Sequence, residues 1–160
     1  MTATNRSMAP RPATLADVAA IAYHRAAMFR DMGEVAAEDF ETLRAASETW
    51  LAPRIASGEY RGWVVEDANT VVAGGGLLLR EMWPVPGCAR AGRWAHIGNV
   101  YTEPAHRRRG LGRVIMQTIL QWCRSNAIDH ITLAASDDGR ALYESLGFAA
   151  DGRSMKVRPK

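Results

Sequence analysis

Residues 99–113 read Asn99-Val100-Tyr101-Thr102-Glu103-Pro104-Ala105-His106-Arg107-Arg108-Arg109-Gly110-Leu111-Gly112-Arg113. The first residues have the composition of a strand, and Pro104 marks the loop that follows it. A helix is predicted next, because apolar residues recur at helical spacing. These residues are Leu111, Val114, Ile115, Ile119 and Trp122. The stretch therefore predicts a strand, a short basic loop and the start of a helix.

The start of this helix is suited to binding an anion. The first N–H groups of a helix have no partner within it and lie at the positive end of its dipole. Gly110 and Gly112 have no side chain that would keep a phosphate from those amides. Arg107, Arg108 and Arg109 precede them and add positive charge and bidentate donors. We therefore predict a pyrophosphate site here.

Two motifs in this part of the chain resemble those of a known family. Arg107-x-x-Gly110-x-Gly112 after a strand is similar to the acyl-CoA-binding signature of the GNAT superfamily of N-acetyltransferases. Leu142-Tyr143-x-x-x-Gly147-Phe148 looks like the C-terminal motif of that family. The resemblance implies that acetyl-CoA is the cosubstrate. It also implies that an acetyl group moves to a primary amine by direct attack in a ternary complex.

The resemblance assigns roles to individual residues. Val100, Tyr101 and Thr102 would pair through their backbone with the pantetheine arm, and the N–H of Val100 or a neighbour would stabilise the oxyanion formed from the thioester carbonyl. The CoA pyrophosphate would bind to Arg107, Arg108, Arg109, Gly110, Leu111, Gly112 and Arg113. Tyr143 would contact CoA and stabilise the departing thiolate, with complete proton transfer only if its surroundings lower its pKa.

The cofactor contact at Ser136 and the general base leave alternatives open. Ser136 stands where many family members have an asparagine that contacts CoA, so its hydroxyl either donates to the cofactor or caps the following helix. His96 has an intrinsic pKa suited to a general base. Glu81 is a second candidate for the base. A relay through water would need no single base.

The acceptor site is expected between the first two helices, the central strands and the last strand pair. Acidic residues cluster where the first two helices meet, and such a rim would attract a cationic amine; a solvated helix face is the alternative. These residues are Asp31, Glu34, Glu38, Asp39 and Glu41. The sequence does not separate a small amine from a peptide or protein amine, and it leaves a homodimer open.

The whole chain predicts one α/β domain with a mixed, mostly antiparallel sheet flanked by about four helices, as the resemblance implies. Residues 1–9 are expected to form a flexible N-terminus and residues 10–160 the domain. Pro10-Arg11-Pro12 can form at most an edge strand. Two helices are predicted from residue 15 to Gly33 and from about Val35 to Gly58, with a bend or an end near Pro53.

The remaining elements are predicted as strands and two further helices. Strands are expected at residues 60–66, 70–80 and 93–102, with a bulge or close backbone packing at Gly74-Gly75-Gly76. A helix over residues 110–126, a strand over 130–134 and a short helix ending at Gly147 follow. A final strand pair is expected through Phe148 and residues 155–157.

Composition excludes several classes of protein. The formal net charge is +3 over 160 residues, and basic residues do not interleave with aromatic ones, so no nucleic-acid partner is expected. Cys88 and Cys123 predict neither a disulfide framework nor a zinc site, and no metal is expected. Without a long apolar N-terminal segment, we expect no membrane contact and a cytoplasmic protein.

Two other functions fit parts of the pattern. One is a non-catalytic sensor of the same fold that binds acyl-CoA. The other is a dinucleotide-binding oxidoreductase, since Gly110-x-Gly112 opens a helix after a strand and Asp137 or Asp138 ends the next strand. Ile115 stands where that motif requires its third glycine, and the preceding strands predict an antiparallel sheet. Both features disfavour the oxidoreductase.

Overall fold

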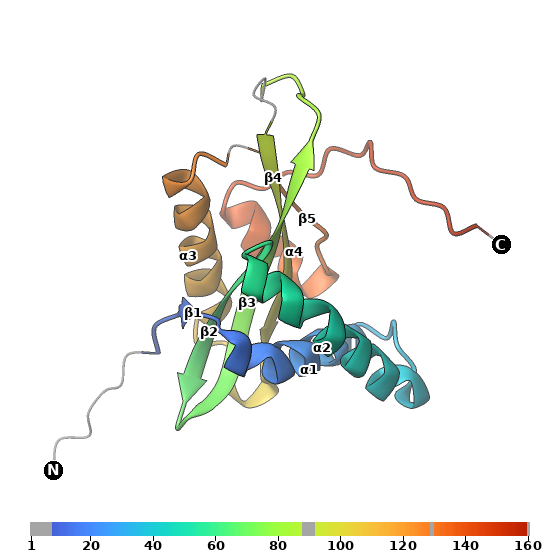
Figure 1. Cartoon of the computed structure of the whole chain (residues 1–160), viewed down its shortest axis with the longest axis vertical. Helices are drawn as coiled ribbons and strands as arrows, with labels where there is room; N and C mark the ends of the chain where they lie inside the picture. Colours follow the sequence, from blue (N-terminus) through green and yellow to red (C-terminus); the bar gives the residue numbers. More distant parts are fainter. Residues whose placement is uncertain (1–7, 88–91, 129, 160) are drawn as a thin grey trace, which may run out of the picture.

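In the residues that the structure describes, the centre of the protein is a five-stranded mixed sheet. The computed structural model describes residues 8–87, 92–128 and 130–159. In these residues the strands follow the order β1 (Arg11–Pro12), β2 (Tyr60–Asp67), β3 (Thr70–Met82), β4 (Gly92–Thr102) and β5 (Ile131–Leu133) (Figure 1). The first four are antiparallel neighbours, and β5 lies parallel to β4. The predicted fold class is confirmed.

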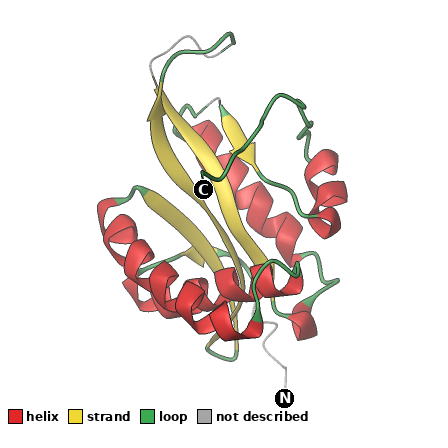
Figure 2. Ribbon diagram, turned by 90° about the vertical axis from the view of Figure 1, so that its right-hand side faces the viewer, coloured by secondary structure: helices red, strands yellow, loops and turns green. Residues whose placement is uncertain are grey.

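Helices cover both faces of the sheet. Helices α1 (Val18–Asp31) and α2 (Phe40–Ser57) lie on one face, and α3 (Leu111–Ser125) and α4 (Asp137–Ser145) lie on the other (Figure 2). Three short 3-10 turns in the described residues precede longer elements. Turn η1 (Leu15–Asp17) precedes α1, η2 (Ala37–Asp39) precedes α2, and η3 (Pro104–His106) precedes the loop that leads into α3. Successive strand residues point to opposite faces, so Val64 packs against α1 and α2 whereas Val65 packs against α3.

The helix ends follow the predicted glycines. Gly33 and Gly58 have φ angles of 72° and 80°, which a residue without a side chain adopts readily. Pro53 lies inside α2, and the helix continues beyond it to Ser57. At the N-terminus, Met8 already packs against the core on the α3 side, and residues 1–7 lie outside the described part of the chain.

The prediction of a final strand pair is wrong. Residues 148–159 form no strand and extend away from the sheet (Figure 1). Phe148 instead belongs to the C-terminal cap of α4. Its N–H donates to the Tyr143 carbonyl at 3.1 Å, and the N–H of Gly147 donates to the Glu144 carbonyl at 3.0 Å. Met155 and Val157 are 94% and 84% exposed, because two apolar residues among charged ones bury too little surface to offset the entropy of ordering.

A bulge interrupts the central pair of strands. Gly76 lies opposite Gly98, but Gly74 lies opposite Tyr101. Two residues of β4, Asn99 and Val100, therefore face a single residue of β3. The extra residue bends β4 and changes which side chains share a face. The predicted irregularity at residues 74–76 is confirmed.

Gly76 provides a test of this close packing. A Cβ at position 76 would overlap the Tyr60 hydroxyl and lie 2.7 Å from the Arg61 carbonyl oxygen, which is backbone and has little room to move. We expect Gly76→Ala to lower the free energy of unfolding by about 3 kcal/mol. Gly98→Ala is the matched control, because a Cβ there meets nothing within 4 Å. Equal urea midpoints for the two variants would contradict this prediction.

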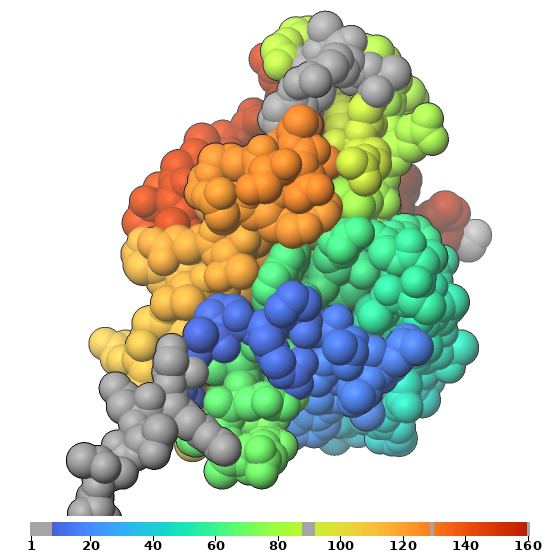
Figure 3. Space-filling model, turned by 60° about the vertical axis from the view of Figure 1, so that its left-hand side comes forward, coloured from blue at the N-terminus to red at the C-terminus, as the bar shows by residue number. Residues whose placement is uncertain are grey.

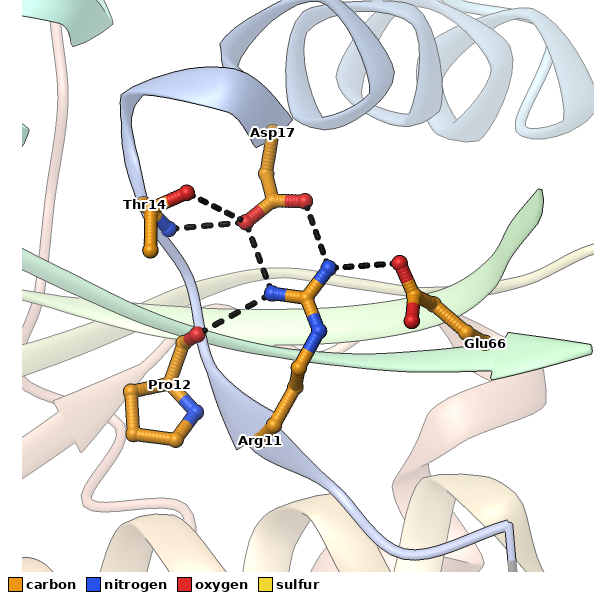
Figure 4. Close-up of polar contacts among 5 residues, drawn as sticks. All are labelled: Arg11, Pro12, Thr14, Asp17 and Glu66. Atoms are coloured by element: carbon orange, nitrogen blue, oxygen red, sulfur yellow. Dashed lines mark hydrogen bonds and ion pairs between the residues drawn. The ribbon is translucent and has the colours of Figure 1, made fainter. Parts of the chain in front are cut away.

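An ion pair fixes β1 to the start of α1. Arg11 donates two bonds of 2.9 Å to Asp17, and it also binds Glu66 at 2.6 Å (Figure 4). Asp17 is 4% exposed and accepts the N–H of Thr14 at 2.7 Å, which caps the 3-10 turn. On this side of the molecule the blue residues around β1 and η1 lie between α3, in yellow to orange, and α2, in teal (Figure 3).

This pair predicts a pH dependence. The guanidinium of Arg11 lowers the pKa of Asp17, so its stabilisation is present above about pH 4 and is lost as pH falls through the lower pKa of the folded state. We expect Asp17→Asn to lower the free energy of unfolding by about 2 kcal/mol at pH 7. The difference should shrink towards pH 3 in urea titrations. Glu41→Gln, at an exposed pair with Arg44, should change little; a pH-independent gap at Asp17 would contradict the mechanism.

Candidate active site

Among the described strands, one edge of β4 is left unpaired where pantetheine binding was expected. β5 pairs only with Ala95, His96 and Ile97 of β4. From residue 98 to Thr102, β4 has a neighbour on the β3 side alone among the described strands. Asn99, with φ 58°, begins the bulge at the point where the pairing ends. The backbone of residues 100–102 can therefore bind an extended ligand as a further strand would.

The N-terminus of α3 follows directly after this edge. Its N-cap is Gly110, with φ 77°, and no side chain of a described residue caps the helix. Arg108 also has a positive φ, 63°, and residues that alternate between left-handed and right-handed conformations turn successive N–H groups towards one concavity. A Cβ at Gly110 would meet nothing within 4 Å. These observations suit an anion at the N–H groups of this turn.

The four arginines of this turn have different surroundings. Arg107 donates to the Thr102 carbonyl at 2.9 Å and to Asp31 at 2.8 Å, which fixes the loop to β4 and α1. Arg113 donates to Ser145 at 2.8 Å and joins α3 to α4. Arg108 and Arg109 are exposed and form no ion pair with a described residue. Two of the four guanidinium groups are therefore available to an anion.

Leu111 and Gly112 serve packing as well as any ligand. The side chain of Leu111 is buried in the core, so only its N–H can face an anion. A Cβ at Gly112 would lie 3.4 Å from Leu142. The glycine therefore lets α4 approach α3 closely, which is a role that the sequence pattern did not indicate.

Tyr143 lies on α4 with its ring against Phe148. Burial raises the pKa of its hydroxyl, so the group stays protonated and the condition for complete proton transfer is not met. Within the described residues the hydroxyl has no hydrogen-bond partner, which leaves it free to donate. Ser136 accepts the N–H of Gly139 at 3.2 Å and caps α4; its hydroxyl proton can still be donated.

The structure separates the two candidate bases. His96 lies between Ala95 and Ile97, which pack towards α3, so its side chain is on the α1 face. Its Nδ1 lies 2.8 Å from Thr132 Oγ1, and partial burial, with the charge of Arg80, lowers its pKa. Glu81 lies opposite Arg93, five residues and about 17 Å along β3 from Gly76. Glu81 is therefore not brought to the bulge.

Sequence reasoning missed a polar cluster beneath the bulge. Asn99 is 6% exposed, accepts a bond of 2.8 Å from Arg25 and donates to the Tyr60 hydroxyl at 3.1 Å. Nearby, His24 lies 3.1 Å from Glu103, and burial lowers its pKa. The available signal was a pair of basic residues, the buried His24 and the half-buried Arg25, within an otherwise apolar helix stripe.

Comparison with known proteins identifies the family. The sequence model of the Acetyltransferase (GNAT) family matches residues 20–148. The chain belongs to this family. A GCN5-related N-acetyltransferase from Ralstonia eutropha JMP134 has the same GNAT fold, with a TM-score of 0.86, 32% identity and coverage of 93% of this chain and 97% of that one. A predicted acetyltransferase from Clostridium acetobutylicum, solved with acetyl-CoA, has a TM-score of 0.82 at 22% identity, covering 93% and 94%.

Two curated GNAT relatives match in sequence. Mycothiol acetyltransferase of Beutenbergia cavernae is 32% identical over 128 residues, which is 75% of this chain and 37% of the relative. Glucosamine 6-phosphate N-acetyltransferase of Trypanosoma brucei brucei is 33% identical over 93 residues, 58% of this chain and 60% of the relative. The chain thus spans less than two thirds of the length of each.

Some carboxylates of the acidic rim of this GNAT domain form ion pairs with arginines of the same chain. Asp31 binds Arg107, which lowers the pKa of the carboxyl group, and also lies 3.5 Å from Arg30. Glu41 binds Arg44 at 2.6 Å. Two of the five acids predicted at the acceptor site are therefore already neutralised by arginine.

The described part of this GNAT domain shows no exposed thiol and no grouping of metal ligands. Cys123 is buried, which raises its pKa to about 11, and Cys88 lies outside the described residues. No group of three or more His, Cys, Asp or Glu side chains is arranged to hold a metal ion in the residues described. None of the helices in those ranges has the length and hydropathy needed to span a bilayer.

Proposed function

We propose that this protein transfers an acetyl group from acetyl-CoA to a primary amine within a ternary complex. The observation that carries the proposal is the unpaired edge of β4 immediately before the uncapped N-terminus of α3. The edge fits an amide-containing arm, and the N-terminus fits a diphosphate. The two occur in the order in which these groups follow one another in CoA.

The residues of the site have distinct roles in this proposal. Acetyl-CoA supplies an activated acetyl group. The N–H of Val100 stabilises the negative charge that develops on the carbonyl oxygen as the amine attacks. The protonated hydroxyl of Tyr143 donates a hydrogen bond to the departing sulfur. His96, kept neutral by its lowered pKa, accepts the amine proton through water.

The names of the relatives support acetyl transfer, but they do not point to a single acceptor. The names mycothiol acetyltransferase and glucosamine 6-phosphate N-acetyltransferase refer to different compounds. We therefore propose the reaction class for this chain, with the acceptor restricted to an amine.

Two measurements test the proposal. Thermal shift should show stabilisation by acetyl-CoA of roughly 2.7 kcal/mol at about 100 times its Kd, and none by NAD. Thiol release with a panel of amines should then show turnover. Binding without turnover would favour the acyl-CoA sensor, and stabilisation by NAD alone would favour the oxidoreductase.

His96 predicts the pH profile. Since its pKa is lowered, the neutral form persists to lower pH than in a free histidine, and kcat/KM should rise with pH along a limb centred below about 6.5. We expect His96→Gln to remove this limb and reduce the plateau about 10-fold. Glu81→Gln is the control and should keep both. An unchanged limb in the His96 variant would favour a relay through water alone.

A further inference from the structure

Arg25 occupies an unusual position for a charged residue. It lies on the stripe of α1 that faces the sheet, one turn after the buried Ile21 and Ala22. Burial is sufficient to lower the pKa of its guanidinium group. The side chain is half-buried, and partial desolvation of a cation favours a bound counter-charge.

The partners of Arg25 do not neutralise it. Its Nη1 donates to Oδ1 of Asn99 at 2.8 Å, and its guanidinium carbon lies 5.0 Å from the centre of the Phe29 ring. In the part of the chain that the structure describes it forms no ion pair with a carboxylate. Arg11, Arg44 and Arg107, by contrast, each bind at least one carboxylate.

The acids that border β4 on this face are bound elsewhere. Asp31 binds Arg107 at 2.8 Å, and Glu103 lies 3.1 Å from His24. Neither of these two carboxylates is therefore left over to pair with Arg25.

The guanidinium group is also held in a fixed place. Asn99 is anchored by its bond to the Tyr60 hydroxyl, and Tyr60 is 4% exposed. Asn99 precedes Val100, whose N–H faces the thioester carbonyl in the proposed function. Arg25 thus contacts Asn99, which is next to the residue whose N–H faces the thioester. A short acceptor bound at the thioester would extend towards Arg25.

We propose that Arg25 binds an oxyanion of the acceptor, so that the substrate is a small amine that carries a carboxylate or a phosphate a few bonds from its nitrogen. This inference rests on the proposed function. Arginine suits both groups, because its planar N–H donors bind two oxygens at once. An acidic acceptor also differs from the cationic amine that the acidic rim predicted.

Matched pairs of amines test the proposal. Thiol release is measured at saturating acetyl-CoA with glycine and glycinamide, and with phosphoethanolamine and ethanolamine. In at least one pair we expect kcat/KM of the anionic member to exceed that of the neutral member by about 100-fold. A preference in the glycine pair would identify the anion as a carboxylate, and a preference in the phosphoethanolamine pair would identify it as a phosphate. Similar values within both pairs would overturn the proposal.

Substitution of Arg25 provides the control for charge. Arg25→Gln keeps a donor for Asn99 but has no charge, and should reduce the preference to a few-fold. Arg25→Lys keeps the charge but not the paired donors, and its preference should lie between those of the wild type and the Gln variant. A preference that survives in the Gln variant would overturn the role of Arg25. Calorimetric titration of the wild type and of each variant with acetyl-CoA separates the two proposals. If the wild type does not bind acetyl-CoA, the proposed acetyltransferase function is itself overturned.

Discussion

Replacing Tyr143 by phenylalanine is expected to reduce kcat about 100-fold while leaving the Kd for acetyl-CoA within a few-fold of the wild type. The substitution removes only the hydroxyl, which has no partner among the described residues, and keeps the ring that packs against Phe148. Since burial raises the pKa of the hydroxyl, it acts on the departing sulfur as a hydrogen-bond donor. A bond that forms mainly in the transition state affects kcat and not binding.

Tyr23→Phe is the matched control for Tyr143, because it removes a hydroxyl from an exposed tyrosine on α1. Its kcat should change less than two-fold. Thiol release at saturating acetyl-CoA measures kcat, and calorimetry measures the Kd. If Tyr143→Phe retained full kcat, the leaving group would need no side-chain donor, and the role proposed for Tyr143 would be withdrawn.

Gly110→Asp is expected to weaken acetyl-CoA binding about 30-fold relative to Gly110→Asn. Both residues tolerate the positive φ of 77° at this position, and both cap helices well. They differ by one negative charge at the proposed diphosphate site. Coulomb repulsion between two charges 4 Å apart lies between about 1 kcal/mol in water and about 4 kcal/mol near a protein surface. A repulsion of about 2 kcal/mol would weaken binding by the expected factor of about 30.

Two further measurements isolate the diphosphate. Acetylpantetheine, which lacks it, should bind equally to both variants. The melting temperature of the Asp variant should equal or exceed that of the Asn variant, because a carboxylate at a helix N-terminus is stabilising. Equal affinities of the two variants for acetyl-CoA would mean that the anion does not bind at the start of α3.

The local elements followed from the sequence because short-range rules determine them. The period of apolar residues predicted α1 and α3, and Gly33 and Gly58 predicted two helix ends. The sequence also predicted a strand, a basic loop and a helix that starts at Gly110, which together are the core of the candidate site. It failed at Phe148, where the last residues of α4 turned an expected strand residue into a helix cap.

Only the tertiary structure decided which side chains meet. The extra residue of the bulge brings Asn99 to the same face of β4 as His96, although an uninterrupted strand would place residues 96 and 99 on opposite faces. Likewise, Arg107 binds Asp31 and Arg25 binds Asn99, and in each case the partner lies more than 70 residues away in the chain. The sequence by itself determined the family motifs and the local elements that carry them. The charges left free at the site depend on long-range contacts, which no local pattern records.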